Sequence, residues 1–188
     1  MRPLVLNDAV AAAVFFPVYG GWIAWELWLQ RRTAGRDRTR AGVFVTTTLG
    51  AALIFPASGW DGQLPGPGWL PVAVGVALLV GGWVFRGWAV HTLGRWFTVT
   101  VTVEPGQHVV DSGPYRLIRH PSYSGMLVTM IGMGVALDSW TSVAVAFVLP
   151  LIGIVLRIHE EEPMLLRELG VPYREYAERT RRLVPGVW

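Results

Sequence analysis

The stretch SYSGMLVTMIGMGVALDSWTSVAVAFVLPLIGIVL (residues 122–156) decides the fold. It holds one charged side chain, Asp138, which lies between two apolar runs, 122–137 and 140–156. Asp and Ser favour turns, so Asp138 and Ser139 predict a tight connection between two helices. A helix needs about 20 mostly apolar residues to span a bilayer. The stretch therefore predicts a membrane-embedded helical hairpin whose first arm is short enough to be tilted or only partly inserted.

Three further apolar runs precede this hairpin, at residues 9–29, 41–60 and 70–90. Each is long enough to predict a membrane span. The first is too long and too apolar for a secretory signal peptide, so we expect it to be retained. The prediction is an all-α integral membrane protein with a single membrane domain, 1–188. It has five transmembrane helices with a C-terminal helical hairpin, a structured cytoplasmic loop and a C-terminal cytoplasmic helix.

The composition agrees with a membrane protein and excludes several other classes. Hydrophobic residues make up 52% of the 188 residues and charged residues 15%, whereas soluble domains carry about 25% charge. The chain has no cysteine, which excludes a disulfide scaffold, a thiolate zinc site and a cysteine nucleophile. The four histidines are scattered, and we expect no metal site. The net charge of +3 comes with high apolar content, which favours lipid headgroups over nucleic acid as the anionic partner.

The distribution of arginine predicts the orientation. Residues 31–40, 91–121 and 157–188 hold 14 of the 16 basic residues, whereas residues 61–69 and the turn at Asp138 hold none. Arginine-rich loops remain on the cytoplasmic side of a membrane. We therefore expect the N-terminus outside, and the C-terminus and both long polar regions in the cytoplasm.

The first polar region, 91–121, predicts local structure outside the membrane. Residues 98–103 read TVTVTV, the two-residue period of a strand, and residues 104–106 form a turn signal. We expect the chain to return through residues 108–110 as a small β-hairpin. The string DSGPYRLIRHPSYSG (111–125) then concentrates polar and turn-forming residues.

Pro121 suits the first turn of a helix, because it lacks the backbone N–H that is unpaired there. The free N–H groups of that turn favour an anion, and Arg119 and His120 come directly before it. A plainer interpretation stays open for each residue: Arg119 could contact lipid headgroups, and His120 could be a structural hydrogen-bonding residue.

The second polar region, 157–188, starts with Arg157 and three adjacent glutamates, 160–162. Neighbouring residues on a helix point in different directions, so at most two of these carboxylates face one site. Gly170 suits a helix C-cap, and Pro172 the first turn of another helix. Tyr173 and Tyr176 would lie on one face of that helix.

Three strings together resemble a family signature: GPYRLIRHPSYSG (113–125), EEPMLL (161–166) and GVPYREYAER (170–179). They look like the isoprenylcysteine carboxyl methyltransferase family of integral membrane enzymes, with phospholipid N-methyltransferases as looser relatives. The string LGRWF (93–97) also looks like that family's approach to its cofactor region. The resemblance covers residues 93–188.

The resemblance implies methyl transfer from S-adenosylmethionine to a lipophilic acceptor that enters from the bilayer, such as a prenylcysteine-like carboxylate or a lipid amine. By the family's motifs, the residues expected at the cofactor are Arg119, His120, Pro121, Tyr123, Glu161 and Glu162. From the same polar regions we add Arg95, His108, Gly113 and Tyr115. The residues expected to be catalytic are Arg157, Glu161 and Glu162, with Arg157 or Arg95 holding an acceptor carboxylate.

The chemistry of these side chains suits the methyl donor, which carries a carboxylate, an ammonium and a sulfonium. Arg119 beside a helix N-terminus suits the carboxylate, and a glutamate suits either cation. Two other interpretations remain. A sterol-reductase-like enzyme would use NADPH, but the chain offers no evident clamp for its 2′-phosphate. A non-catalytic lipid-binding subunit would leave the dense polar strings without a purpose.

Overall fold

The computed structural model describes residues 4–32, 50–58, 63–98, 103 and 106–188, and these residues are almost entirely helical. The only β-type pairing in the described ranges is one isolated bridge, between Ile118 and Arg181. The α-helices are α1 (Leu4–Asn7), α2 (Ala9–Arg32), α4 (Trp69–Leu93), α5 (Pro121–Ala136), α6 (Trp140–Leu169) and α7 (Val171–Arg179), with a helical segment at 50–57 and the 3-10 turns η2 (Gly94–Trp96) and η3 (Gly113–Arg116).

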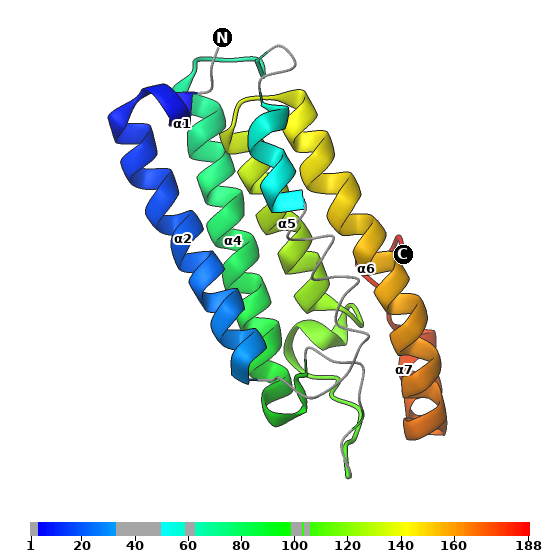
Figure 1. The fold of residues 1–188 in the computed structure, drawn as a ribbon. Helices are drawn as coiled ribbons and strands as arrows, with labels where there is room; N and C mark the ends of the chain where they lie inside the picture. Colours follow the sequence, from blue (N-terminus) through cyan, green and yellow to red (C-terminus); the bar gives the residue numbers. More distant parts are fainter. Residues whose placement is uncertain (1–3, 33–49, 59–62, 99–102, 104–105) are drawn as a thin grey trace.

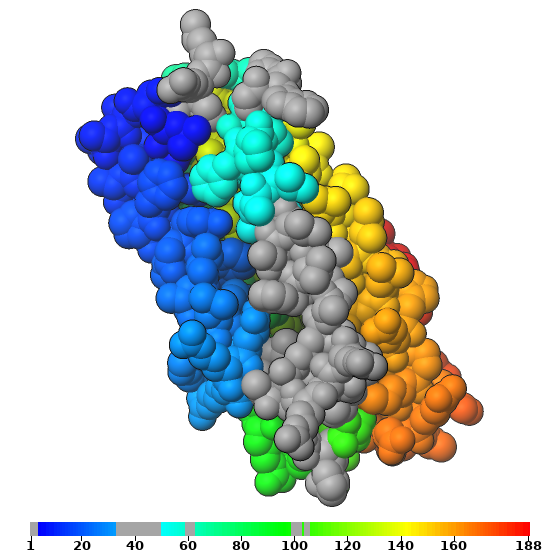
Figure 2. All heavy atoms as spheres, viewed as in Figure 1, coloured from blue at the N-terminus to red at the C-terminus, as the bar shows by residue number. Residues whose placement is uncertain are grey.

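The long helices lie side by side in a bundle (Figure 1). α4 packs on α5 and α2, and α5 also packs on α6. Figure 2, drawn in the same view, shows α2 (blue) along one side of the molecule and α6 (yellow to orange) along the other. α7 and residues 106–120 lie at the end of the bundle opposite α1 (Figure 1). Residues 106–120 of the first polar region and α7 of the second are thus found at the same end of the molecule.

Three of the described helical segments are long and apolar enough to cross a membrane: Ala9–Arg32, Trp69–Trp96 and Trp140–Leu169. They contain the first, third and fifth predicted spans. α5 has 16 residues, fewer than the 20 or so that a perpendicular span needs, as expected for a short arm. Of the second predicted span, residues 41–49, 59 and 60 lie outside the described residues. That the chain has five membrane spans therefore stays a prediction.

α6 is longer than the sequence analysis anticipated. The predicted span ends at Leu156, whereas the helix continues to Leu169 and has 30 residues, or about 45 Å. Its apolar part, 140–156, is followed by a charged part that extends past the length of a membrane span. Gly170 caps the helix at its C-terminal end, and its φ of 63° suits glycine. Pro172 lies in the first turn of α7, so both of these predictions are confirmed.

The predicted β-hairpin after α4 is not supported where it can be followed. Residues 99–102 and 104–105 lie outside the described residues. The expected return strand, 108–110, is irregular, so that prediction is wrong. The His108 ring instead packs edge-on against Trp96, with ring centroids 5.7 Å apart.

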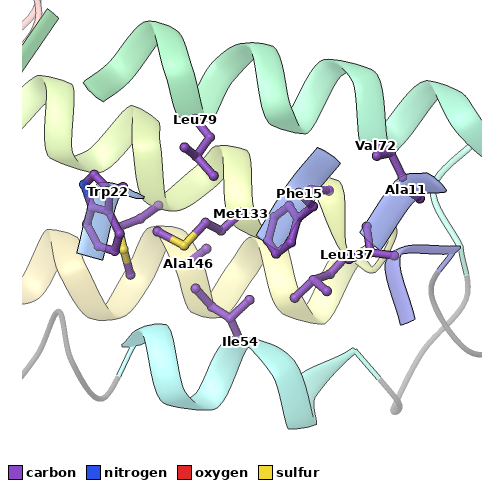
Figure 3. Packing of buried hydrophobic residues seen from close by; sticks show 12 residues of the cluster. Ala11, Phe15, Trp22, Ile54, Val72, Leu79, Met133, Leu137 and Ala146 are labelled. Atoms are coloured by element: carbon purple, nitrogen blue, oxygen red, sulfur yellow. The ribbon is translucent and has the colours of Figure 1, made fainter. Parts of the chain in front are cut away.

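The bundle core consists of fully buried aliphatic, aromatic and sulfur-containing side chains (Figure 3). Phe15 of α2, Leu79 of α4, and Met133 and Leu137 at the end of α5 are at most 1% exposed. In lipid, helix association depends on van der Waals packing rather than on water exclusion. The close fit of these side chains therefore holds the bundle together.

Glycines bring α4 and α5 into backbone contact. A Cβ on Gly82 would lie 2.5 Å from the backbone nitrogen of Thr129, and one on Gly132 would lie 2.4 Å from that of Leu79. Small residues allow such approach between membrane helices. Gly81, the neighbour of Gly82, would meet nothing within 4 Å. Gly82 and Gly132 are therefore packing residues, whereas Gly81 is not.

This difference gives a matched pair of substitutions. Gly82→Ala is expected to destabilise the protein by about 1–3 kcal/mol, because the new methyl group collides with the backbone of α5. Gly81→Ala adds the same methyl group where there is space, and should leave stability equal or slightly higher. Thermal unfolding in detergent, followed by circular dichroism, measures both. Equal melting temperatures for the two variants would refute the close helix contact.

Candidate functional site

The chain that precedes α5 pairs with the chain that follows α7. The backbone N–H of Arg119 donates to the carbonyl of Arg181 at 2.6 Å, and that of His120 donates to the carbonyl of Arg182 at 3.0 Å. The Ser124 hydroxyl donates to the Leu183 carbonyl at 2.7 Å. Two polar stretches that lie about 60 residues apart in the sequence are thus held side by side.

Glu162, in the charged part of α6, joins these stretches. Its Oε1 accepts from Arg119 Nε at 2.9 Å and lies 3.3 Å from His120 Nε2. Its Oε2 accepts from Arg182 Nε at 3.0 Å and from Arg182 Nη2 at 2.8 Å. Burial opposes ionisation of this carboxyl, but the hydrogen bonds from His120, Arg182 and Arg119 outweigh it and hold the pKa of Glu162 well below its usual range. Glu162 is therefore a charged link between α6 and both stretches.

Arg119 uses its remaining contacts within the protein. Its Nη1 donates to the carbonyls of Ala177 and Thr180, at 2.7 and 2.6 Å. These carbonyls lie at the C-terminal end of α7, where a helix has unpaired acceptors and a partial negative charge. Arg119 thus ties α7 to Glu162.

Glu161 forms a second group with Tyr123 and Arg157. The Tyr123 hydroxyl donates to Glu161 Oε2 at 2.7 Å. Arg157 Nε lies 3.4 Å from the Tyr123 hydroxyl and 3.9 Å from Glu161 Oε2. The Tyr123 ring stacks on His120 at 5.5 Å, which connects the two glutamate groups. The Glu161 side chain is 25% exposed, against 15% for Glu162, and Glu160 is exposed.

Three buried tyrosines, Tyr115, Tyr173 and Tyr176, lie near this cluster. The Tyr176 hydroxyl donates to the Tyr115 carbonyl at 2.9 Å. The Tyr173 hydroxyl is buried and has no hydrogen-bond partner among the described residues. Burial raises the pKa of Tyr115, Tyr173 and Tyr176, and the charges of Glu162 and Glu161 raise that of Tyr173 further. These hydroxyls keep their protons, and Tyr173 has one to donate.

The other expected residues have different positions. Pro121 begins α5 as predicted, with His120 at the N-cap. Gly113, with φ of 55°, lies beside Thr92 and Trp88. Arg95 and His108 both contact Trp96, with the guanidinium of Arg95 4.1 Å from the ring centroid. The structure therefore joins most of the predicted residues but places Arg95 and His108 in a separate group around Trp96. The group that it brings together comprises Tyr115, Arg119, His120, Pro121, Tyr123, Arg157, Glu161 and Glu162.

A small cavity of about 150 Å³ borders the cluster on the side of the C-terminal segment. It is lined by Arg119, Ala177, Thr180, Arg181, Arg182, Val187 and Trp188. The guanidinium of Arg182 lies over the Trp188 ring, 5.3 Å from its centroid. The cavity is mainly polar, because three arginines contribute to its wall.

A buried ion pair between α2 and α4 was not predicted from the sequence. Arg86 Nε donates to Glu26 Oε1 at 2.6 Å, and Arg86 Nη2 donates to Glu26 Oε2 at 3.0 Å. Arg86 Nη1 also donates to the carbonyl of Ser122, at 3.1 Å, and to its hydroxyl. Ionisable residues inside apolar helices are rare and mark function. That signal was present in the sequence, where both charges interrupt apolar runs.

The sequence model of the Isoprenylcysteine carboxyl methyltransferase (ICMT) family matches residues 74–167, half of the chain. Protein-S-isoprenylcysteine O-methyltransferase A of Arabidopsis thaliana is 36% identical over 121 residues, which are 63% of this chain and 61% of that protein. The cobalt-zinc-cadmium resistance protein CzcN of Cupriavidus metallidurans is 32% identical over 155 residues, 79% of this chain and 64% of that protein. This chain thus spans less than two thirds of these relatives.

A solved structure, that of the eukaryotic intramembrane Ras methyltransferase ICMT, has the same fold. It superposes with a TM-score of 0.59 at 25% sequence identity, over 79% of this chain and 51% of that chain. This likeness and the three long apolar helices identify an integral membrane protein. With the family match over residues 74–167, they show that the chain belongs to the isoprenylcysteine carboxyl methyltransferase family.

Proposed function

We propose that this chain is a membrane methyltransferase that transfers a methyl group from S-adenosylmethionine to a lipophilic acceptor. One observation carries the proposal: the two polar regions converge on Glu161, Glu162, Tyr123 and His120 at one end of the bundle. The names of the plant relatives and of the solved structure agree with this chemistry.

The residues of the cluster fit S-adenosylmethionine. Glu161 is the more exposed of the two glutamates, and a carboxylate suits the ammonium or sulfonium of the donor. The buried Tyr173 hydroxyl has a proton to give and no hydrogen-bond partner in the described part of the chain. An oxygen or nitrogen atom of S-adenosylmethionine would accept that hydrogen bond. Arg119 has its Nε and Nη1 bound to the protein. We assign it and Glu162 a positioning role.

S-adenosylmethionine, when bound, supplies a methyl group bonded to a cationic sulfur. The task of the protein is then to align the acceptor with that methyl group, because direct displacement depends on position more than on proton transfer. A carboxylate acceptor is already ionised at neutral pH and needs a cation to hold it. Arg157 is buried beside Tyr123 and Glu161 and keeps that pair oriented.

We assign the acceptor carboxylate to Arg86, which would have to exchange one of its present partners, Glu26 or Ser122, for the acceptor. Arg86 is 5% exposed, lies between the apolar helices and contacts Ser122, next to the start of α5. Arg95, which the sequence analysis considered for this role, lies on Trp96 instead.

We propose the remaining topology from the sequence. Five helices cross the membrane within a single domain, α5 and α6 form a C-terminal hairpin, and the N-terminus is outside. The cluster around Glu161 and Glu162 then faces the cytoplasm. The arginine distribution supports this orientation.

Labelled methyl transfer tests the function. Purified protein is incubated with methyl-labelled S-adenosylmethionine and total membrane lipid, or with an S-farnesylcysteine derivative, and the products are identified by mass. We expect a lipophilic methyl ester, and alkaline hydrolysis of this ester should release labelled methanol. A base-stable labelled lipid would indicate an amine acceptor. No labelled product from a folded protein that binds the donor would contradict methyltransferase function.

The two tyrosines of α7 provide a matched test of the donor site. Tyr176→Phe removes a buried hydrogen bond and should lower stability by about 1 kcal/mol. Tyr173→Phe removes a hydroxyl that has no partner in the described residues, so stability should be unchanged or higher. Because we expect the Tyr173 hydroxyl to donate a hydrogen bond to S-adenosylmethionine, Tyr173→Phe should weaken binding of this ligand about tenfold. Calorimetric titration and thermal unfolding separate the two effects, and unaltered donor binding would place Tyr173 outside the site.

A further inference from the structure

The Glu26–Arg86 pair lies at the level of the candidate site. Each residue is 17 positions from the first residue of its helix, or about 26 Å along the axis. α2 and α4 run side by side from the same end of the bundle (Figure 1). Ser122, which Arg86 contacts, is one position before Tyr123. Arg86 also acts electrostatically on Tyr115, as Glu161 and Tyr123 do. The pair therefore belongs to the surroundings of the site.

Protein acceptors already bind almost all of the N–H groups of Arg86. A guanidinium has five N–H groups. Glu26 takes one from Nε and one from Nη2, and Ser122 accepts from Nη1 through both its carbonyl and its hydroxyl. The arginine is also 5% exposed. A ligand carboxylate that binds through two N–H groups must therefore displace Glu26, or displace Ser122 and lie next to the Glu26 carboxylate.

Both routes are opposed by the charge of Glu26. In the first, two carboxylates compete for one guanidinium. In the second, two like charges lie on adjoining edges of the same group, where repulsion is poorly screened. We propose that Glu26 is an internal counter-ion that lowers the affinity of Arg86 for an acceptor carboxylate, and so sets the acceptor specificity of the site. This inference rests on the proposed function.

A purely structural pair makes the opposite prediction. Removing one partner of a buried pair leaves an uncompensated charge and destabilises the protein. If Glu26 served only packing, its loss would weaken every function of the site. If it competes with the acceptor, its loss leaves Arg86 available and strengthens carboxylate binding. The sign of the effect distinguishes the two.

The test is Glu26→Gln, measured by titration of an S-farnesylcysteine acid and of its methyl ester into protein in lipid nanodiscs without S-adenosylmethionine. We expect the variant to bind the acid about tenfold more tightly than the wild type, because one opposing charge is removed. Binding of the uncharged ester should be unchanged. In turnover, the KM for the acid should fall while kcat changes little. The control is Glu168→Gln, the same substitution at an exposed position.

Unchanged or weaker binding of the acid by folded Glu26→Gln would overturn the proposal. If that variant does not fold, Glu26→Asp decides, because it keeps the charge but withdraws it by one methylene; a gain of about threefold supports the proposal, and no gain overturns it. A wild-type protein that binds neither acid nor ester and transfers no methyl group would refute the proposed function itself. A wild type that methylates the acid while Glu26→Gln behaves identically would refute only the role of Glu26.

Discussion

Glu162→Ala is expected to abolish S-adenosylmethionine binding and to lower the melting temperature by about 10 °C. The substitution leaves Arg119 and Arg182 without their carboxylate, and breaking a buried ion pair in this way costs about 3 kcal/mol. It also frees α7 and the segment after it from α6, because Arg119 joins Glu162 to the end of α7. Thermal unfolding and calorimetric titration measure the two effects.

The adjacent Glu160 is the matched control for this experiment. Its side chain is exposed and belongs to the same helix, so Glu160→Ala should change neither stability nor donor binding by more than twofold. If Glu162→Ala behaved like Glu160→Ala, the ionic link between α6 and α7 would have no role in the site.

The double variant Glu26→Gln/Arg86→Gln is expected to lose methyl transfer to a carboxylate acceptor by about 100-fold, as removal of a buried charged hydrogen-bonding partner typically does. Both charges are removed together, so no uncompensated charge remains between α2 and α4. Donor binding should be unchanged, because neither residue contacts Glu161 or Glu162 in the described contacts. The measurements are kcat/KM with an S-farnesylcysteine acid and titration with S-adenosylmethionine. Full activity in the folded double variant would exclude Arg86 as the acceptor anchor.

Apolar runs and single turn or capping residues predicted where most of the described helices begin and end. The apolar runs gave the positions of α2, α4 and α6, and Asp138 with Ser139 gave the turn before α6. Gly170 and Pro172 marked the boundary between α6 and α7, because a positive φ and a missing N–H are requirements of single residues. The family motifs likewise indicated that Glu161 and Glu162 share a site with Tyr123 and His120.

The full length of α6 and the pairing of distant charges were not predicted from the sequence. Arg157 and the glutamates after it indicated the end of a span, but a helix does not end where a membrane does, and α6 continues to Leu169. Glu26 and Arg86 are 60 residues apart, and only the packing of α2 on α4 shows that they pair. Arg119 looked available for a ligand until the carbonyls of α7 were placed against it.

Titration of S-adenosylmethionine into the wild-type protein and into Glu161→Gln tests whether two separate polar regions build one methyl-donor site around the Glu161 carboxylate. We expect saturable one-site binding to the wild type and at least about tenfold weaker binding to the variant. The melting temperature should fall by only about 2–4 °C, because glutamine still accepts the hydrogen bond from Tyr123 and Arg157 loses only a long, 3.9 Å ion pair. A folded wild-type protein without affinity for S-adenosylmethionine, or equal affinity in both proteins, would contradict the account.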